Sequence, residues 1–226
     1  MDLFDFAGVA AGQSRERLAP ENLAPEHMAP GAVLLRGRAL ASDRDLLAGI
    51  AAVAAAAPFR HMHTPGGFEM SVAMTSCGEA GWVTDRRGYR YERCDPASGA
   101  PWPPMPGAFV ALARASAAEA GFPDFAPDAC LINRYAPGAR MSLHQDKDEQ
   151  DFSRPIVSVS LGLPCMFQFG GANRSDPVKK YELRHGDVVV WGGPSRLYYH
   201  GVLRLKDGEH PLTGGLRYNL TFRGAL

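Results

Sequence analysis

The sequence predicts a mainly β protein with flanking helices, an α+β chain whose core is a jelly roll or barrel. After residue 128, eight short runs suited to strands follow one another without an intervening helical pattern. The run 156–161 alternates apolar and hydroxyl side chains, as a strand in a sheet does. Glycine and proline turns at 137–138, 170–171 and 192–194 separate the runs and favour the same fold.

The chain before this core begins with a segment of biased composition. Residues 1–30 are rich in alanine and proline, and we expect a loosely ordered leader there. A short strand is expected at 32–36. The alanine-rich run 43–57 then predicts a helix, which ends before Pro58 because proline cannot continue it.

The middle of the chain predicts short strands, an irregular connection and a second helix. Glycines among aromatic residues indicate strands in 59–91, five prolines make 95–106 irregular, and 107–120 is helical. The expected core strands are 130–135, 141–146, 156–161, 166–169, 178–183, 188–191, 197–202 and 216–222. We therefore divide the chain into the leader 1–30, an N-terminal part 31–128 and a core 129–226, the last two forming one compact unit.

Composition narrows the class of protein. The 226 residues carry a formal net charge of zero, which gives no support to a nucleic-acid binder acting through charge alone. Four cysteines form no C-x-x-C pair and predict reduced thiols. The first residues lack a basic signal region, and the longest apolar run, 46–59, is too short to span a bilayer. We therefore expect a soluble cytoplasmic protein without membrane contacts.

A candidate metal site begins with His144 and Asp146. Two residues apart on one strand, they project to the same face and together can hold a metal ion. Among the downstream histidines, His185 and His210 fall in a turn and a loop, whereas His200 falls on an expected strand and has a rigid mount. Two histidines and one carboxylate make the facial triad typical of non-heme Fe(II) oxygenases.

Other interpretations of the same residues stay open at this point. The H-x-D pair also fits a solvated acidic loop, since 146–151 is strongly polar. It equally fits a metal-binding jelly roll without catalysis. A rival site at His61 and His63 has no carboxylate spaced to complete it.

A second group of polar residues lies on the last expected strand. The residues on one face are Arg217, Asn219, Thr221 and Arg223. Two arginines on one face suit a dicarboxylate, because each guanidinium can bind a carboxylate with two hydrogen bonds. Asn133 and Tyr135, which also share a face, could add neutral donors. The alternative is an amphipathic strand whose polar face lies in water.

A basic cluster interleaved with tyrosines occupies 86–93. Its arginines are Arg86, Arg87, Arg90 and Arg93, and its tyrosines are Tyr89 and Tyr91. By charge alone, we interpret the cluster as the solvated face of a hairpin.

The motifs combine into a recognisable order. They are Asn133-x-Tyr135-x-x-Gly138-x5-His144-x-Asp146, then His200, then Arg217-x-Asn219-x3-Arg223, with Thr64-Pro65-Gly66-Gly67 upstream. In this order the chain resembles the AlkB family, its bacterial members most closely, from about residue 31 to residue 223.

The resemblance implies a double-stranded β-helix (jelly-roll) dioxygenase core preceded by a nucleotide-recognition lid. It implies an enzyme that uses Fe(II), 2-oxoglutarate and O2. By family correspondence the metal ligands and catalytic residues are His144, Asp146 and His200. The residues that bind 2-oxoglutarate are Asn133, Tyr135, Arg217, Asn219 and Arg223, with Arg217 on the distal carboxylate.

The resemblance also implies the reaction and the partners. A ferryl species would hydroxylate the N-methyl group of 1-methyladenine or 3-methylcytosine, with release of formaldehyde, succinate and CO2. This is direct reversal of alkylation damage. The implied partners are single- or double-stranded DNA and also RNA. The protein is expected to bind them as a monomer. An oxygenase of the same fold acting on a protein or small molecule is the alternative.

The residues expected to bind the substrate follow from the same resemblance. Trp82 and His200 would sandwich the flipped base, although Trp82 taken alone fits a half-buried core aromatic. Met74 would line the pocket, Tyr89 would contact a phosphate, and Arg174 matches a substrate-binding position. Asp148 would face the exocyclic amino group of a cationic base. Residues 82–91 would form the lid and give the 86–93 arginines a phosphate-binding role, against which Asp85 counts as an acid among them.

Overall fold

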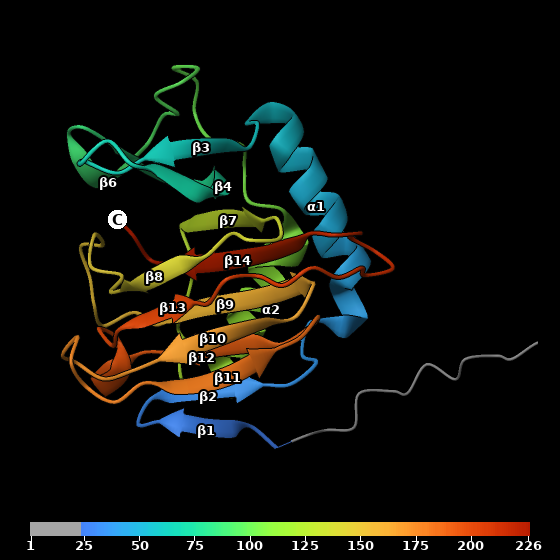
Figure 1. The fold of residues 1–226 in the computed structure, drawn as a ribbon, viewed down its shortest axis with the longest axis vertical. Helices are drawn as coiled ribbons and strands as arrows, with labels where there is room; N and C mark the ends of the chain where they lie inside the picture. The colour runs from blue at the N-terminus through green and yellow to red at the C-terminus, as the bar shows by residue number, and fades with distance from the viewer. Residues whose placement is uncertain (1–23) are drawn as a thin grey trace, which may run out of the picture.

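The computed structural model describes residues 24–226, in which two sheets face each other and two helices cover one side (Figure 1). The large sheet has the order β1-β2-β12-β9-β14-β7-β4-β3 and the small sheet the order β11-β10-β13-β8. In the large sheet these are β1 (Glu26–Ala29), β2 (Ala32–Leu35), β12 (Val188–Trp191), β9 (Ile156–Gly162), β14 (Arg217–Arg223), β7 (Ala129–Tyr135), β4 (Glu69–Gly78) and β3 (Arg60–His63). In the small sheet they are β11 (Lys179–Leu183), β10 (Cys165–Phe169), β13 (His200–Val202) and β8 (Met141–His144).

The remaining elements surround this pair of sheets. A separate hairpin consists of β5 (Gly81–Asp85) and β6 (Gly88–Glu92). The helices are α1 (Asp43–Ala56) and α2 (Gly107–Glu119), with short 3-10 turns at Leu40–Ser42 and Gly193–Ser195. Within residues 24–226 no helix is long and apolar enough to cross a membrane.

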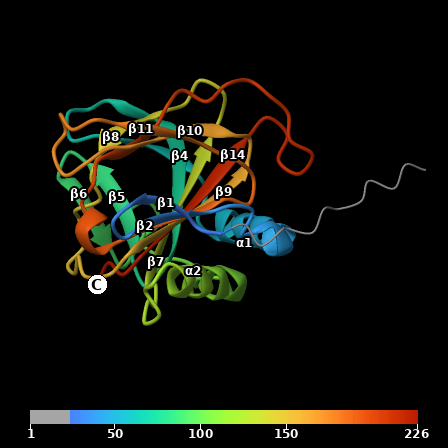
Figure 2. The same cartoon turned by 90° about the horizontal axis from the view of Figure 1, so that it is seen from below.

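Both faces of the large sheet are buried. Successive side chains along each strand point to opposite faces, and each face packs in its own apolar cluster. On β9, Val157 and Val159 pack in one cluster with Leu46 and Phe109 of the helices. Figure 2 shows both helices on the side of the large sheet that lies away from the small sheet. The opposite face looks into the space between the sheets, so the jelly-roll core expected from the sequence is confirmed.

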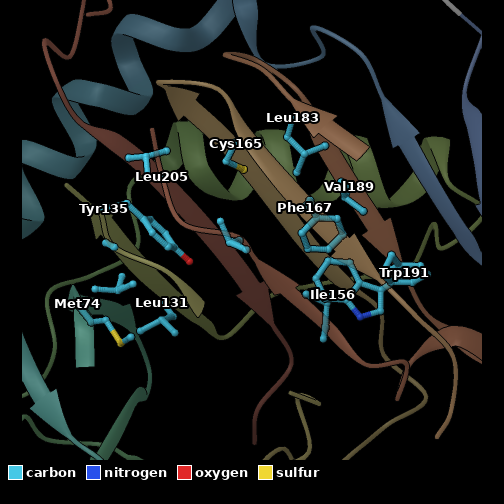
Figure 3. Close-up of a cluster of buried hydrophobic side chains, with 14 of the residues drawn as sticks. Met74, Leu131, Tyr135, Ile156, Cys165, Phe167, Leu183, Val189, Trp191 and Leu205 are labelled. Carbon is cyan, nitrogen blue, oxygen red and sulfur yellow. The ribbon is translucent and has the colours of Figure 1, made fainter. Parts of the chain in front are cut away.

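A second apolar cluster fills much of the space between the sheets. Phe167 and Phe169 of β10 lie near Trp191 of β12, with ring centroids 6.3 Å apart in each pair. Tyr135 and Met74 belong to the same buried cluster, at the end nearer β4 (Figure 3). All of these side chains except Phe169 line the same cavity as the polar residues of the site.

Several expected element bounds were wrong. The strand β1 lies inside the expected leader 1–30, where it pairs with β2; residues 1–23 fall outside the described part. The strand β8 ends at His144, so Asp146 follows the strand instead of lying on it. The strand β13 begins at His200, because residues 196–197 form a turn and residues 198–199 belong to no strand.

The expected boundary at 128/129 does not divide the fold. The strand β4, from the N-terminal part, pairs along β7 from Ala73–Arg134 to Gly78–Ala129. The strand β2 pairs with β12 over four residues. Strands from both parts therefore share one sheet.

Candidate active site

Neighbouring strands place the three candidate metal ligands together. His144 and His200 are direct partners in the ladder between β8 and β13, and their ring centroids lie 4.4 Å apart. The ligand atoms of His144, Asp146 and His200 all lie within 4.8 Å of one another. The structure brings together the three residues chosen from the sequence, although only the histidines are on strands.

Both histidines are oriented for a metal by the main-chain carbonyl of the residue two positions before each of them. The Nδ1 atom of His144 lies 2.8 Å from the carbonyl oxygen of Ser142, and Nδ1 of His200 lies 3.0 Å from that of Tyr198. Because a carbonyl only accepts hydrogen bonds, each Nδ1 carries the proton. The lone pair of each Nε2 is left for a metal, as the outer contacts of metal-binding histidines commonly arrange.

The electrostatics of the triad match a cation site. Burial lowers the pKa of His200 to about 4, helped by His144, so its imidazole is neutral near pH 7. Burial alone would raise the pKa of Asp146, but the guanidinium charge of Arg223, together with the two histidines when they are protonated, outweighs it and leaves the pKa below its ordinary value. Neutral imidazoles and an ionised carboxylate are the forms that bind a divalent metal.

Beside the triad, Arg217 forms the core of an anion site. Its side chain is buried, with 1% of the residue exposed, and its Nη2 donates to the Ser160 hydroxyl at 3.0 Å. Its Nε and Nη1 atoms have no hydrogen-bond partner within residues 24–226. A buried cation with unpaired donors is costly unless an anion pairs with it, so these residues fit the carboxylate of 2-oxoglutarate.

The neutral residues expected beside Arg217 lie in the same place. Asn133 and Asn219 are direct ladder partners, and the Asn133 amide donates to Asn219 Oδ1 at 3.1 Å. Tyr135, the ladder partner of Arg217, holds its ring 5.8 Å from the guanidinium. The polar face of β14 is therefore turned into the fold, and the interpretation as a solvated face was wrong.

Arg223 was expected to help bind 2-oxoglutarate, but its side chain pairs with two carboxylates of the protein. Its Nε and Nη2 atoms donate to Asp146 Oδ2, at 3.1 and 2.5 Å. Its Nε also lies 3.1 Å from Glu149 Oε1. Although Arg223 lines the same cavity, its guanidinium lies against the metal carboxylate.

The residues expected at the base pocket gather at the same cavity. Trp82 of β5 donates its indole N–H to Asp148 Oδ2 at 2.8 Å and stacks on Tyr89, with ring centroids 5.7 Å apart. Arg174 donates to the carbonyl of Leu143 at 2.8 Å, and Met74 is buried in β4. These five residues, the triad and the five expected 2-oxoglutarate residues all line one cavity of about 830 Å³.

The arginines of the hairpin are partly neutralised by their own neighbours. Arg90 pairs with Asp85 at 2.9 Å and with Glu92 at 2.6 Å, and Arg87 pairs with Asp85 at 3.1 Å. Arg86 and Arg93 are exposed and make no ion pair within residues 24–226. The hairpin therefore offers less free positive charge than its sequence suggests.

Sequence reasoning missed two charged residues behind the triad. Glu149 and Arg196 form a buried ion pair at 3.1 Å, and Arg196 also donates to the main-chain carbonyl of Asp146 at 2.8 Å. Glu149 belongs to a run of acids that looks solvated in the sequence. Nothing in local composition distinguishes its buried carboxylate from its exposed neighbours.

Comparisons with known proteins agree with this geometry. Residues 31–223 match the model of the 2OG-Fe(II) oxygenase superfamily. The alpha-ketoglutarate-dependent dioxygenase AlkB of Escherichia coli (strain K12) is 62% identical over 195 residues, which cover 86% of this chain and 90% of that protein. The AlkB homolog of Caulobacter vibrioides (strain NA1000 / CB15N) is 46% identical over 187 residues, covering 82% of this chain and 83% of that protein.

A solved structure supports the same assignment. The structure of OsALKBH1 matches with a TM-score of 0.76 at 30% identity, covering 88% of this chain and 100% of that one. The fold, the metal triad and the similarity over most of the chain therefore lead to one conclusion. The chain belongs to the AlkB family of the 2OG-Fe(II) oxygenase superfamily and is a dioxygenase dependent on Fe(II), 2-oxoglutarate and O2.

Proposed function

We propose that this protein removes methyl groups by oxidation from N-alkylated bases, chiefly 1-methyladenine and 3-methylcytosine, in DNA and in RNA. One observation carries the proposal: Trp82 and Asp148 meet in the same cavity that holds the metal triad and Arg217. A flat ring and a carboxylate are the groups that a flipped cationic base needs. The AlkB similarity, and that to a DNA N(6)-methyladenine demethylase of Arabidopsis thaliana (40% identical over 108 residues), supports nucleic acid as the substrate.

Each group of residues has one task in this proposal. His144, Asp146 and His200 hold Fe(II), while Arg217 pairs with one carboxylate of 2-oxoglutarate and Asn133, Tyr135 and Asn219 complete its site. Arg223 orients Asp146 through Oδ2. When bound, the iron, 2-oxoglutarate and O2 supply the oxidation that turns the N-methyl group into N-hydroxymethyl, with succinate and CO2 as the other products. The hydroxymethyl group then leaves as formaldehyde and restores the base.

The pocket residues would select the damaged base by shape and charge. Trp82 and His200 would hold the flipped ring, with Met74 filling the apolar side. Asp148 would accept a hydrogen bond from the exocyclic amino group. Because 1-methyladenine and 3-methylcytosine are cationic near pH 7 and normal bases are not, the Asp148 carboxylate favours the lesion. Tyr89 and Arg174, both exposed at the cavity, would contact the strand.

The test uses the purified protein with Fe(II), 2-oxoglutarate, ascorbate and an oligonucleotide carrying one 1-methyladenine. We expect mass spectrometry to show the oligonucleotide losing one CH2 unit, with one succinate formed for each base restored. The His144→Ala variant, which lacks a metal ligand, should do neither while it keeps its far-UV circular dichroism. An unaltered oligonucleotide would sink the nucleic-acid proposal, and succinate formed only with a protein or small molecule would favour that class of substrate.

We further propose that the protein acts as a monomer in the cytoplasm. All four cysteines are free thiols, as expected for a reducing compartment. Light scattering during size-exclusion chromatography tests the monomer, and a dimer mass would contradict it. Cell fractionation tests the compartment.

A further inference from the structure

A buried acid, Glu149, connects three charged or polar side chains behind the metal triad. The residue is 6% exposed. Its Oε1 accepts from the Tyr91 hydroxyl at 2.8 Å and lies 3.1 Å from Arg223 Nε. Its Oε2 accepts from Arg196 Nη2 at 3.1 Å. We call Tyr91, Glu149, Arg196 and Arg223 the Glu149 clasp.

The two arginines of the clasp hold both parts of Asp146. Arg223 donates to the carboxylate oxygen Oδ2 at 2.5 Å, while the other oxygen, Oδ1, lies 3.6 Å from His144 Nε2. Arg196 donates to the main-chain carbonyl of Asp146 at 2.8 Å. Arg223 therefore occupies one carboxylate oxygen and leaves Oδ1 facing the ligand nitrogen of His144.

The clasp reaches the β5–β6 hairpin through Tyr91. Trp82 and Tyr91 are direct partners in the hairpin ladder, so their side chains share a face. Trp82 donates to Asp148 at 2.8 Å and Tyr91 donates to Glu149 at 2.8 Å. Two adjacent positions of the hairpin thus bind two consecutive acids that follow the metal ligand Asp146. Burial raises the pKa of Tyr91, so its hydroxyl keeps the proton that it donates.

We propose that Glu149 is a positioning residue that couples the β5–β6 hairpin to the metal carboxylate, so that metal binding and ordering of the hairpin reinforce each other. The proposal deepens the demethylase function, because this hairpin carries Trp82 to the base pocket. Its physical basis is charge balance in a buried site. Glu149 neutralises the two arginines, and without its charge Arg223 would rely on Asp146 alone and compete with the metal for that carboxylate.

The metal end of the coupling is tested by Glu149→Gln, which keeps the shape and removes the charge. We expect the affinity for Mn(II), measured by isothermal titration calorimetry on the full chain, to fall about tenfold, or about 1.4 kcal/mol. Glu119→Gln is the matched control, since Glu119 pairs with Arg38 at the surface. Circular dichroism verifies that the variant is folded. Mn(II) affinity within twofold of the unmodified protein in folded Glu149→Gln overturns the proposal.

The hairpin end is tested by Tyr91→Phe, which removes one hydroxyl. Hydrogen exchange followed by mass spectrometry should show that Mn(II) with 2-oxoglutarate slows exchange in 81–92 of the unmodified protein. The Tyr91→Phe variant should lose that response and still bind Mn(II). Tyr181→Phe is the matched control, because the Tyr181 hydroxyl makes no hydrogen bond within residues 24–226 and its loss should leave the response intact.

These measurements separate a positioning role from a structural one. A structural role would lower the stability of the variants while Mn(II) still slowed hairpin exchange equally in both proteins, and that result overturns the coupling. So does a hairpin whose exchange is insensitive to the metal in the unmodified protein. Neither experiment contains nucleic acid, so failure of the clasp and failure of the demethylase proposal are distinguishable. If Glu149→Gln does not fold, the Tyr91→Phe exchange experiment decides alone.

Discussion

Arg217 carries two buried guanidinium nitrogens that have no hydrogen-bond partner within residues 24–226, and it lines the same cavity as the oriented ligand His144. At the scale of single residues, the site is therefore built for molecules from outside: a cation between His144, Asp146 and His200, and an anion at Arg217. Trp82 and Asp148 satisfy each other with one hydrogen bond, which holds the carboxylate in place before a base arrives.

Replacement of Arg217 by methionine should separate ligand binding from stability. We expect the affinity for 2-oxoglutarate to fall about a hundredfold, because two charge-assisted hydrogen bonds of about 1.5 kcal/mol or more each are lost. The ligand-free protein should be as stable as before or more so, since a buried unpaired cation is removed. Titration calorimetry in the presence of Mn(II) and thermal unfolding measure the two effects. A 2-oxoglutarate affinity within threefold of the unmodified protein would refute the anion site.

Replacement of Asp148 by asparagine should affect the base more than the co-substrate. Asparagine can still accept from Trp82 but carries no charge to pair with a cationic base. We expect kcat/KM for 1-methyladenine repair to fall about tenfold, a loss of about 1.4 kcal/mol, with little change in the succinate formed without nucleic acid. Equal losses in the two assays would argue against a base-reading role.

At the scale of elements, the strand ends decide the geometry. The strand β8 stops at His144, and Asp146 follows in a segment without regular secondary structure, where Arg196 and Arg223 hold it. The strand β13 starts at His200, directly opposite His144. The edge strand β3 is also held by a contact from outside the sheet. Its Arg60 pairs with Asp95 of the proline-rich connection at 2.6 Å.

The Arg60–Asp95 pair should make stability depend on pH. Burial would raise the pKa of Asp95, but hydrogen bonds from Arg60 and from the main-chain N–H of Ala97 outweigh it, so the pKa is lower in the fold than in the unfolded chain. The pair therefore stabilises the protein above the ordinary aspartate pKa of about 3.9, and this contribution is lost as the pH falls through the native value.

For Asp95→Asn we expect a loss of about 1.5 kcal/mol at pH 7 that shrinks below about pH 4. Urea unfolding at pH 7 and below about pH 4 measures this loss of unfolding free energy. Asp124→Asn, at an exposed position, is the control and should differ little from the unmodified protein at either pH. A loss from Asp95→Asn that is independent of pH would contradict the assigned cause.

At the scale of the whole molecule, one sheet joins the two halves of the chain. The strands β2, β3 and β4 from the N-terminal part lie in the same eight-stranded sheet as β7, β9, β12 and β14. The helices α1 and α2 cover its outer face together, in one apolar cluster. The site sits between this sheet and the small sheet, so both halves contribute to it.

The shared sheet predicts a single cooperative unfolding transition. Because β4 pairs with β7 over six residue pairs, neither half can keep its core without the other. Thermal unfolding followed by tryptophan fluorescence and by far-UV circular dichroism should give the same midpoint. Two separated transitions would show that the N-terminal part folds as a domain of its own.

Much of the fold and the site could be predicted because the signals are local. Alternation in 156–161 and the turn residues between runs indicate strands, and His144-x-Asp146 shows two ligands in three residues. The buried role of Glu149 could not be predicted, because its sequence neighbours are acids that face water. The position of Arg223 against Asp146 depends on a pairing across 77 residues of sequence.

The sequence by itself determined the fold class, the three candidate ligands and the strand that carries the arginines, since side-chain periodicity and residue type are properties of short segments. Only the tertiary structure decided that the face of β14 turns inward, that the hairpin arginines are partly neutralised by Asp85 and Glu92, and that Glu149 lies under the metal triad. The physical reason is burial. Whether a charge lies in water or in the interior depends on which distant elements cover it, and its energy and its partners depend on that cover.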